Sequence, residues 1–114
     1  MRYLLLINGD ETRYPKLSEA ETDQLMAAYD DYTESLKAAG AFIASDRLQF
    51  TSAATTVRVR DGKTMTTDGP FAETKEQLGG YYHIEAKDLD EAIAWAAKIP
   101  TAHYGCVEVR PVWG

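Results

Sequence analysis

The predicted first strand is apolar on both of its sides, and this limits the folds that are open to the chain. Residues 1–8 contain a continuous apolar run from Tyr3 to Ile7. Successive side chains of a β-strand point to opposite faces of a sheet, so such a strand needs cover on both faces. The rest of the chain offers few helices, which can cover one face. We therefore expect a second subunit to cover the other.

Two segments carry helix signals. Ser18 and Glu21 have the spacing of a capping box, in which each side chain bonds the backbone amide of the other residue. An apolar stripe at helical spacing follows as far as Gly40, so a helix is predicted over residues 19–39. Asp88 is expected to begin a second helix, which ends before Pro100. The buried side of this second helix is expected to consist of Leu89, Ala92, Ile93, Ala96 and Ala97.

The remaining periodic segments carry strand signals. Asp61-Gly62 separates two runs in which polar and apolar residues alternate. This residue pair favours the positive φ angles of a hairpin turn. A bulge or bend is expected at residues 45–47, where polar residues interrupt an apolar strand. The predicted strands cover residues 1–8, 41–50, 55–60, 63–67, 80–86 and 106–112.

The order of these segments predicts a single α+β domain over residues 1–114. When the hairpin is set aside, the order is βαββαβ, which is the order of the ferredoxin-like fold. In that fold an antiparallel sheet carries both helices on one face, and its other face is bare. Because the first strand needs cover on that face too, we expect a homodimer.

Composition and charge argue against several classes of function. The chain is 45% hydrophobic and 26% charged, with a net charge of −6, which is typical of a globular domain. Its scattered basic residues do not favour binding to nucleic acid or to an anionic membrane. The apolar run near the start is too short for a signal peptide or a membrane span. Cys106 is the single cysteine, so we expect a cytoplasmic protein with a packed thiol.

The segment Asp68–Gln77 is the least generic part of the sequence. It reads Asp-Gly-Pro-Phe-Ala-Glu-Thr-Lys-Glu-Gln and is followed by Leu-Gly-Gly-Tyr-Tyr. This run resembles the DGPF-domain, or YCII-related, family of small bacterial proteins. The resemblance extends over nearly the whole chain. It is also carried by Thr56–Arg58, Asp88–Ala92, Ile99-Pro100 and Val107–Pro111.

The resemblance implies a dimeric α+β barrel, in which two ferredoxin-like units pack sheet on sheet with a cleft at or near the interface. Most members of the family have no assigned biochemical function. Many are encoded beside, or fused to, extracytoplasmic-function sigma factors. Two alternatives follow. One is a small-molecule-binding protein, or a small enzyme without a cofactor, and the other is a non-catalytic regulatory module associated with such a sigma factor.

More distant relatives have been proposed as enzymes that use a His–Asp pair, with the histidine on the first helix. This chain has no histidine between Ser18 and Gly40, and Tyr29–Tyr32 occupies the middle of that helix. The pair is therefore not carried over to this chain. The two histidines of the sequence also lack the spacing of metal ligands, so no metal site is expected.

Asp68 and His83 are the candidate catalytic residues. A carboxylate in a cleft can act as a general acid or base, whereas Asp-Gly-Pro also suits a turn in which the carboxylate bonds backbone amides two residues on. His83 has a side chain that titrates near neutral pH, and its alternative role is that of a hydrogen-bonded core or interface histidine. Tyr81 shares the predicted strand face of His83 and is a candidate ligand-binding residue.

The other candidate ligand-binding residues are charged. Glu73 and Lys75 place opposite charges in the loop, where they can bind a polar substrate or form a solvated charge run. Arg58 and the pair Asp46-Arg47 can pair with carboxylates or bind an anionic ligand. The expected ligand is a small polar or aromatic molecule.

Two further features concern how the loop is held. Phe71 is expected to anchor it on the core or on the second subunit. Gly79-Gly80 begins a strand and is followed by no helix, so it predicts a bulge or a close backbone approach and not a phosphate-binding loop.

Overall fold

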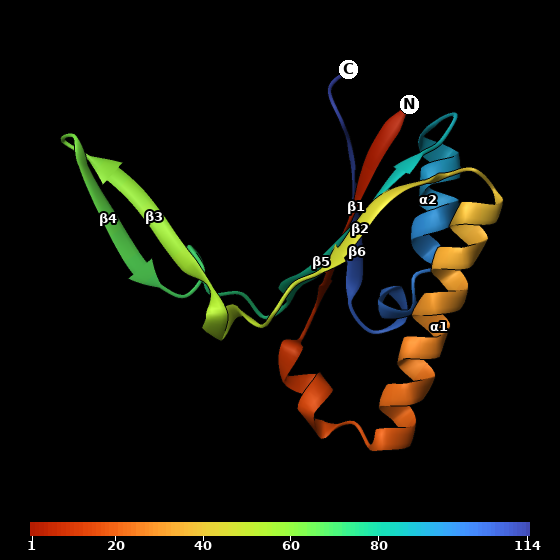
Figure 1. The fold of residues 1–114 in the computed structure, drawn as a ribbon, viewed down its shortest axis with the longest axis horizontal. Coiled ribbons are helices and arrows are strands. Elements are labelled where there is room, and N and C mark those ends of the chain that lie inside the picture. Colours follow the sequence, from red (N-terminus) through yellow and green to blue (C-terminus); the bar gives the residue numbers. More distant parts are fainter.

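A four-stranded antiparallel sheet with both helices on one face forms the body of the molecule (Figure 1). The structure is a computed structural model that describes all 114 residues. In spatial order the strands are β2 (Phe42–Arg47), β5 (Gln77–Glu85), β1 (Arg2–Gly9) and β6 (Cys106–Pro111). The helices are α1 (Glu19–Ala38) and α2 (Leu89–Ala97). This order and the antiparallel pairing confirm the predicted ferredoxin-like α+β fold.

Strand β1 is apolar on both faces, and one of these faces is buried within the chain. Tyr3, Leu5 and Ile7 face the helices and are 2%, 0% and 7% exposed. Leu4 and Leu6 point to the other side and are only half-buried. We call this side, opposite the helices, the bare face of the sheet.

Helix α1 begins and ends where its sequence signals place it. The Glu21 amide donates to the Ser18 hydroxyl oxygen at 3.1 Å, and the Ser18 amide donates to the Glu21 carboxylate at 3.0 Å. Tyr32 and Leu36 are buried against the sheet. Gly40 has a φ of 69°, as expected of a residue that follows a helix. Neither α1 nor α2 is long and apolar enough to cross a membrane.

Helix α2 starts at its predicted cap, but its buried side differs from the prediction. Ala92 and Ala96 are buried, whereas Leu89 and Ile93 are each 49% exposed. Small alanine side chains allow the helix backbone to lie close to the sheet. As a result, the larger side chains of Leu89 and Ile93 lie to one side of the contact between α2 and the sheet.

The hairpin forms an arm that extends away from the sheet (Figure 1). Its strands β3 (Thr55–Arg60) and β4 (Lys63–Asp68) pair only with each other. Asp61 and Gly62 have φ angles of 53° and 73°, which confirms the predicted turn. The radius of gyration of the chain is 16.1 Å, whereas a compact domain of this length has about 13 Å. The arm, residues 55–68, accounts for this extended shape.

Short 3-10 helices occupy three segments outside the predicted helices and strands. The first, η1 (Glu11–Lys16), follows β1 and is started by Asp10, whose carboxylate accepts a hydrogen bond from the Thr12 amide at 3.0 Å. Two more, η2 (Thr51–Ala53) and η3 (Pro100–His103), lie before the arm and before β6.

Strand β2 differs from its prediction in length and in the place of its irregularity. It ends at Arg47, and its pairing with β5 shifts between Phe42 and Ala44, not at residues 45–47. The polar residues Ser45, Asp46 and Arg47 are paired in register with β5. The polar run therefore does not mark a break in β2. It marks the end of the sheet at which these three side chains lie.

Leu36→Ala is expected to lower the free energy of unfolding by about 2–5 kcal/mol, because a fully buried leucine leaves a cavity when it is shortened. Leu89→Ala, at a half-exposed position of α2, is the matched control and should cost less than about 1 kcal/mol. Urea unfolding at one fixed protein concentration, followed by circular dichroism, measures both. Equal losses in the two variants would contradict this packing.

Candidate functional site

Asp68 lies at the end of the arm and is exposed. The next residue, Gly69, fastens the base of the arm: its amide donates to the Ala54 carbonyl at 2.7 Å, and its carbonyl accepts from the Thr56 hydroxyl at 2.8 Å. The predicted turn bond of the Asp68 carboxylate is wrong, because the residue two positions on is Pro70, which has no amide hydrogen.

Three candidate residues of the loop and the arm have no ion-pair partner within this chain, and their roles as ligand-binding residues remain predictions. Glu73, Lys75 and Arg58 are exposed and take part in no ion pair. Phe71 is 81% exposed. The prediction that it anchors the loop on the core of its own chain is therefore wrong, and the second predicted surface, that of another subunit, remains a prediction.

Tyr81, Asp46 and His83 lie on the bare face of the sheet. Tyr81 of β5 is paired in register with Asp46 of β2, and its hydroxyl donates to the Asp46 carboxylate at 2.7 Å. This hydrogen bond is the main reason why the pKa of Tyr81 is raised. His83 is half-buried, and its Nε2 atom is buried without a hydrogen-bond partner. Asp68 and His83 belong to different sheets, so the structure does not join the two candidate catalytic residues in one site.

Cys106 is exposed, which corrects the prediction of a packed thiol. Its sulfur donates to the Glu76 carboxylate at 3.7 Å. Local burial and the negative charge of Glu76 raise the pKa of the thiol, so it stays protonated near neutral pH. No group of three or more histidine, cysteine, aspartate or glutamate side chains is placed to hold a metal ion.

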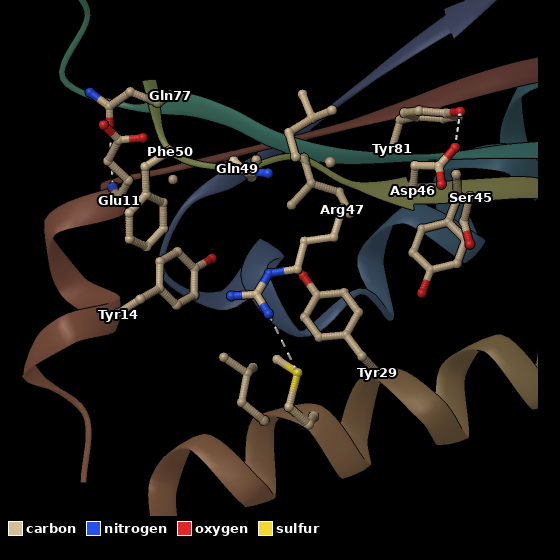
Figure 2. Close-up of a pocket in the computed structure, with 18 of the residues that line it drawn as sticks. Glu11, Tyr14, Tyr29, Ser45, Asp46, Arg47, Gln49, Phe50, Gln77 and Tyr81 are labelled. Carbon is tan, nitrogen blue, oxygen red and sulfur yellow. Dashed lines mark hydrogen bonds between the residues drawn. The ribbon is translucent and has the colours of Figure 1, made fainter. Parts of the chain in front are cut away.

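A cavity of about 310 Å³ lies on the helix side of the sheet, at the end where β2 and β1 finish. Its walls come from η1, from the middle of α1 and from the segment that follows β2 (Figure 2). Sequence reasoning missed this cavity. Leu25 and Tyr29 belong to the apolar stripe that predicts α1, and such a stripe is typical of the packed side of a helix. In the structure both are only half-buried and line the cavity.

Gly79 and Gly80 shape the wall of the cavity where β5 lies beside β2. The pairing of β1 and β5 skips Gly79, whose carbonyl instead accepts from the Leu48 amide at 2.9 Å. A side-chain carbon added to Gly80 would lie 2.9 Å from the Asp46 carbonyl oxygen, closer than such contacts occur. The predicted bulge and close backbone approach are both confirmed.

At one end of the cavity, tyrosine hydroxyls lie near Thr101, which is fully buried and does not itself line the cavity. The Tyr29 hydroxyl lies 2.5 Å from the Thr101 Oγ1 atom, and the Tyr104 hydroxyl lies 3.4 Å from it. Burial raises the pKa of Tyr29 to about 12, although its bond with Thr101 acts in the opposite direction. Burial also raises the pKa of Tyr14, against smaller opposing effects of Thr101 and Arg47. Both phenols are therefore neutral hydrogen-bond donors near pH 7.

Arg47 brings a positive charge to the same end of the cavity. Figure 2 shows its guanidinium group between the rings of Tyr14 and Tyr29. Its one hydrogen bond runs from Nη1 to the Met26 sulfur at 3.9 Å. A thioether is a weak acceptor, and a guanidinium has five N–H donors, so most of its donor capacity is unused by the protein.

Three acidic residues are part of the cavity lining, and none of them forms an ion pair with Arg47. Glu11 accepts from the amide of Thr51 at 3.0 Å and from its hydroxyl. Asp46 accepts from Tyr81 on the bare face. Asp30 is exposed on α1. The cavity thus combines a cation without a counter-ion, neutral phenols and apolar side chains.

Stability is expected to fall as pH rises from about 10 to about 12, the interval between the ordinary pKa of tyrosine and that of Tyr29 in the fold. In this window folded Tyr29 keeps a proton that the unfolded chain loses, so stabilisation present below pH 10 is lost as the pH rises. Thermal unfolding across the window should show a shallower decline for Tyr29→Phe than for the unsubstituted protein. Identical slopes would contradict the buried, protonated state of this hydroxyl.

Comparison with known proteins places the chain in a family. The model of the YCII-related domain matches residues 1–114, which include the sheet, both helices and the arm. An uncharacterized protein of Rhizobium meliloti (strain 1021) is 39% identical over 114 residues, covering 98% of this chain and 92% of the relative. The chain therefore belongs to the YCII-related domain family.

Proposed function

We propose that the protein binds a small molecule in the cavity between α1, η1 and the sheet. The observation that carries this proposal is the cavity itself, whose volume is about 310 Å³. Ligand pockets have volumes of about 300–1,000 Å³ and combine apolar walls with a few polar groups. An interior filled by side chains would have favoured the regulatory alternative instead.

The walls of the cavity suit a ligand with an apolar or aromatic body and one polar end. Leu25 and Met26 of α1 supply apolar surface. Phe50 stacks with Tyr14 at a centroid distance of 6.2 Å and an interplanar angle of 20°, and the two rings form an aromatic part of the lining. The phenol of Tyr14 and the guanidinium of Arg47 supply the polar end (Figure 2).

A more specific version of this proposal is that the protein is an enzyme that acts on the bound molecule without a cofactor. Neutral phenols beside an arginine can stabilise negative charge that develops on an oxygen of a ligand. A reaction also requires an acid or base of suitable pKa within reach of the ligand. Binding is the part of the proposal that the cavity supports by itself.

Leu25→Trp is expected to abolish binding while the protein stays folded, because the larger side chain fills the cavity from the side of α1. Ile93→Trp is the matched control, since Ile93 is half-exposed on α2 and does not line the cavity. The probes are neutral, cationic and anionic aromatic fragments, and the readout is the shift of backbone amide resonances in ¹⁵N-labelled protein. We expect shifts at Gly80, Tyr82 and their neighbours in the unsubstituted protein and in Ile93→Trp.

Two results would overturn the proposal. One is that no fragment shifts the amide resonances of the residues that line the cavity. The other is undiminished binding by a folded Leu25→Trp variant.

We also propose that the protein is a homodimer in which a second subunit covers the bare face. Leu4 and Leu6 are half-buried there, and the Nε2 atom of His83 has no partner. A second sheet packed on this face would bury the leucines and can supply an acceptor for the histidine.

The arm supports the same proposal, because a two-stranded hairpin is marginally stable alone in water. Val57 and Val59 share one face of the arm and are 59% and 58% exposed. Arg58, Arg60 and Met65 lie on its opposite face. A second subunit can cover the valine face while the basic face stays solvated.

Sedimentation at micromolar concentration should give the mass of a dimer. Leu6→Glu should shift the protein towards monomer, because it places a charge in the centre of the bare face. Leu89→Glu, at a half-exposed position of α2, should leave the mass unchanged. A monomeric unsubstituted protein would refute the homodimer and leave the cavity proposal untouched.

A further inference from the structure

The pleat of β2 separates two neighbouring residues of opposite charge. Asp46 and Arg47 are adjacent in the sequence, so their side chains point to opposite faces of the sheet. Asp46 turns to the bare face, where it accepts the hydrogen bond of Tyr81. Arg47 turns to the helix side and enters the cavity (Figure 2). The strand thereby separates Arg47 from the carboxylate that is its nearest neighbour in sequence.

No other carboxylate replaces that counter-ion. The chain has 18 acidic and 12 basic residues, so carboxylates are abundant. Even so, Arg47 forms no ion pair, and Glu11, which lines the same cavity, is bonded to Thr51. Arg47 is an exposed residue that lines a cavity of ligand size, and its guanidinium has donors that the protein does not use.

The groups around Arg47 also favour an anion. The phenols of Tyr14 and Tyr29 flank the guanidinium (Figure 2) and stay protonated near neutral pH. The Tyr29 hydroxyl lies close to Thr101, and Thr101 and Tyr104 also influence the hydroxyl of Tyr14. A carboxylate fits the planar fork of an arginine through two parallel hydrogen bonds and can accept a third from a phenol.

The apolar side of the cavity determines the rest of the ligand. Leu25 and Met26 line the same cavity as the stacked rings of Tyr14 and Phe50. A slot between aliphatic and aromatic walls suits a flat or short hydrocarbon body. A single arginine with no second cation in the cavity lining matches one negative charge better than the two charges of a phosphate ester.

The basic residues of the arm do not offer a comparable site. Arg58, Arg60 and Lys63 are exposed, as Arg47 is, but no residue of either arm strand lines the cavity. Their charges can attract an anion only through solvent, where such interactions are weak and screened by salt.

We infer that the ligand of the cavity is a small organic carboxylate with an apolar or aromatic body, and that Arg47 recognises its negative charge. This inference rests on the proposed function, because it names the class of ligand that the cavity binds. Tyr14 donates a further hydrogen bond to the carboxylate. Leu25, Met26 and Phe50 contact the hydrocarbon part.

Benzoate and phenylacetate, each compared with its neutral amide, test this inference. Titrations followed by amide resonances are expected to give the carboxylates an affinity at least roughly 10-fold higher than that of the amides, since a hydrogen bond to a charged group contributes more than one between neutral groups. Arg47→Met should weaken carboxylate binding by roughly 10- to 100-fold and leave the amides unaffected. Arg47→Lys keeps the charge but not the fork and should restore part of the affinity.

Arg60→Met is the matched control, since it removes one exposed arginine from the arm and should leave both affinities unchanged. Thermal unfolding confirms that each variant is folded. Phenyl phosphate and benzylamine complete the set of probes. If phenyl phosphate binds more tightly than benzoate, the carboxylate class is wrong. If benzylamine does, the exposed Asp30 determines the preference and the inference is wrong.

The failure of this inference can be told from that of the proposed function. If carboxylates and amides bind equally well, and Arg47→Met changes neither affinity, the cavity still binds small molecules but does not select an anion. If no probe of any charge shifts the cavity resonances, both proposals fail.

Discussion

The structure depends on one constraint, which is that its central strand is apolar on both faces. β1 lies between β5 and β6 and sends Tyr3, Leu5 and Ile7 towards the helices. Because α1 and α2 both pack on that side, Leu4 and Leu6 remain on the bare face. The same arrangement places the cavity. The buried residues of α1, Tyr32 and Leu36, lie towards its end, and the middle of this 20-residue helix, from Leu25 to Thr33, borders an unfilled space closed by η1.

Much of the fold could be predicted because its signals are local. Ser18 with Glu21, Asp61-Gly62 and Asp88 each determine a cap or a turn within a few residues of themselves, and each does so in the structure. The direction of the arm is not a local property, since alternating residues pair into the same hairpin whether or not it packs on the sheet. The exposure of Leu89 depends likewise on how closely two alanines bring α2 to the sheet.

The cavity could not be predicted from the sequence for a similar reason. Its walls come from η1, α1 and the end of β2, which are distant in the sequence and meet only through the fold. A tyrosine such as Tyr29 has the same helical spacing whether it fills a core or lines a pocket. The sequence did identify Arg47 as a possible anion-binding residue, but not the side of the sheet on which it lies. Asp68 and His83 are located on separate sheets, and their roles remain predictions.

The central claim is that Arg47 holds the charged end of a ligand inside the cavity, and a crystal structure after soaking with benzoate tests it most directly. We expect electron density for benzoate between α1 and the sheet, with its carboxylate within hydrogen-bond distance of the Arg47 guanidinium and its ring against Leu25 or Phe50. Benzoate bound instead along the arm or on the bare face, with the cavity holding only water, would contradict the account.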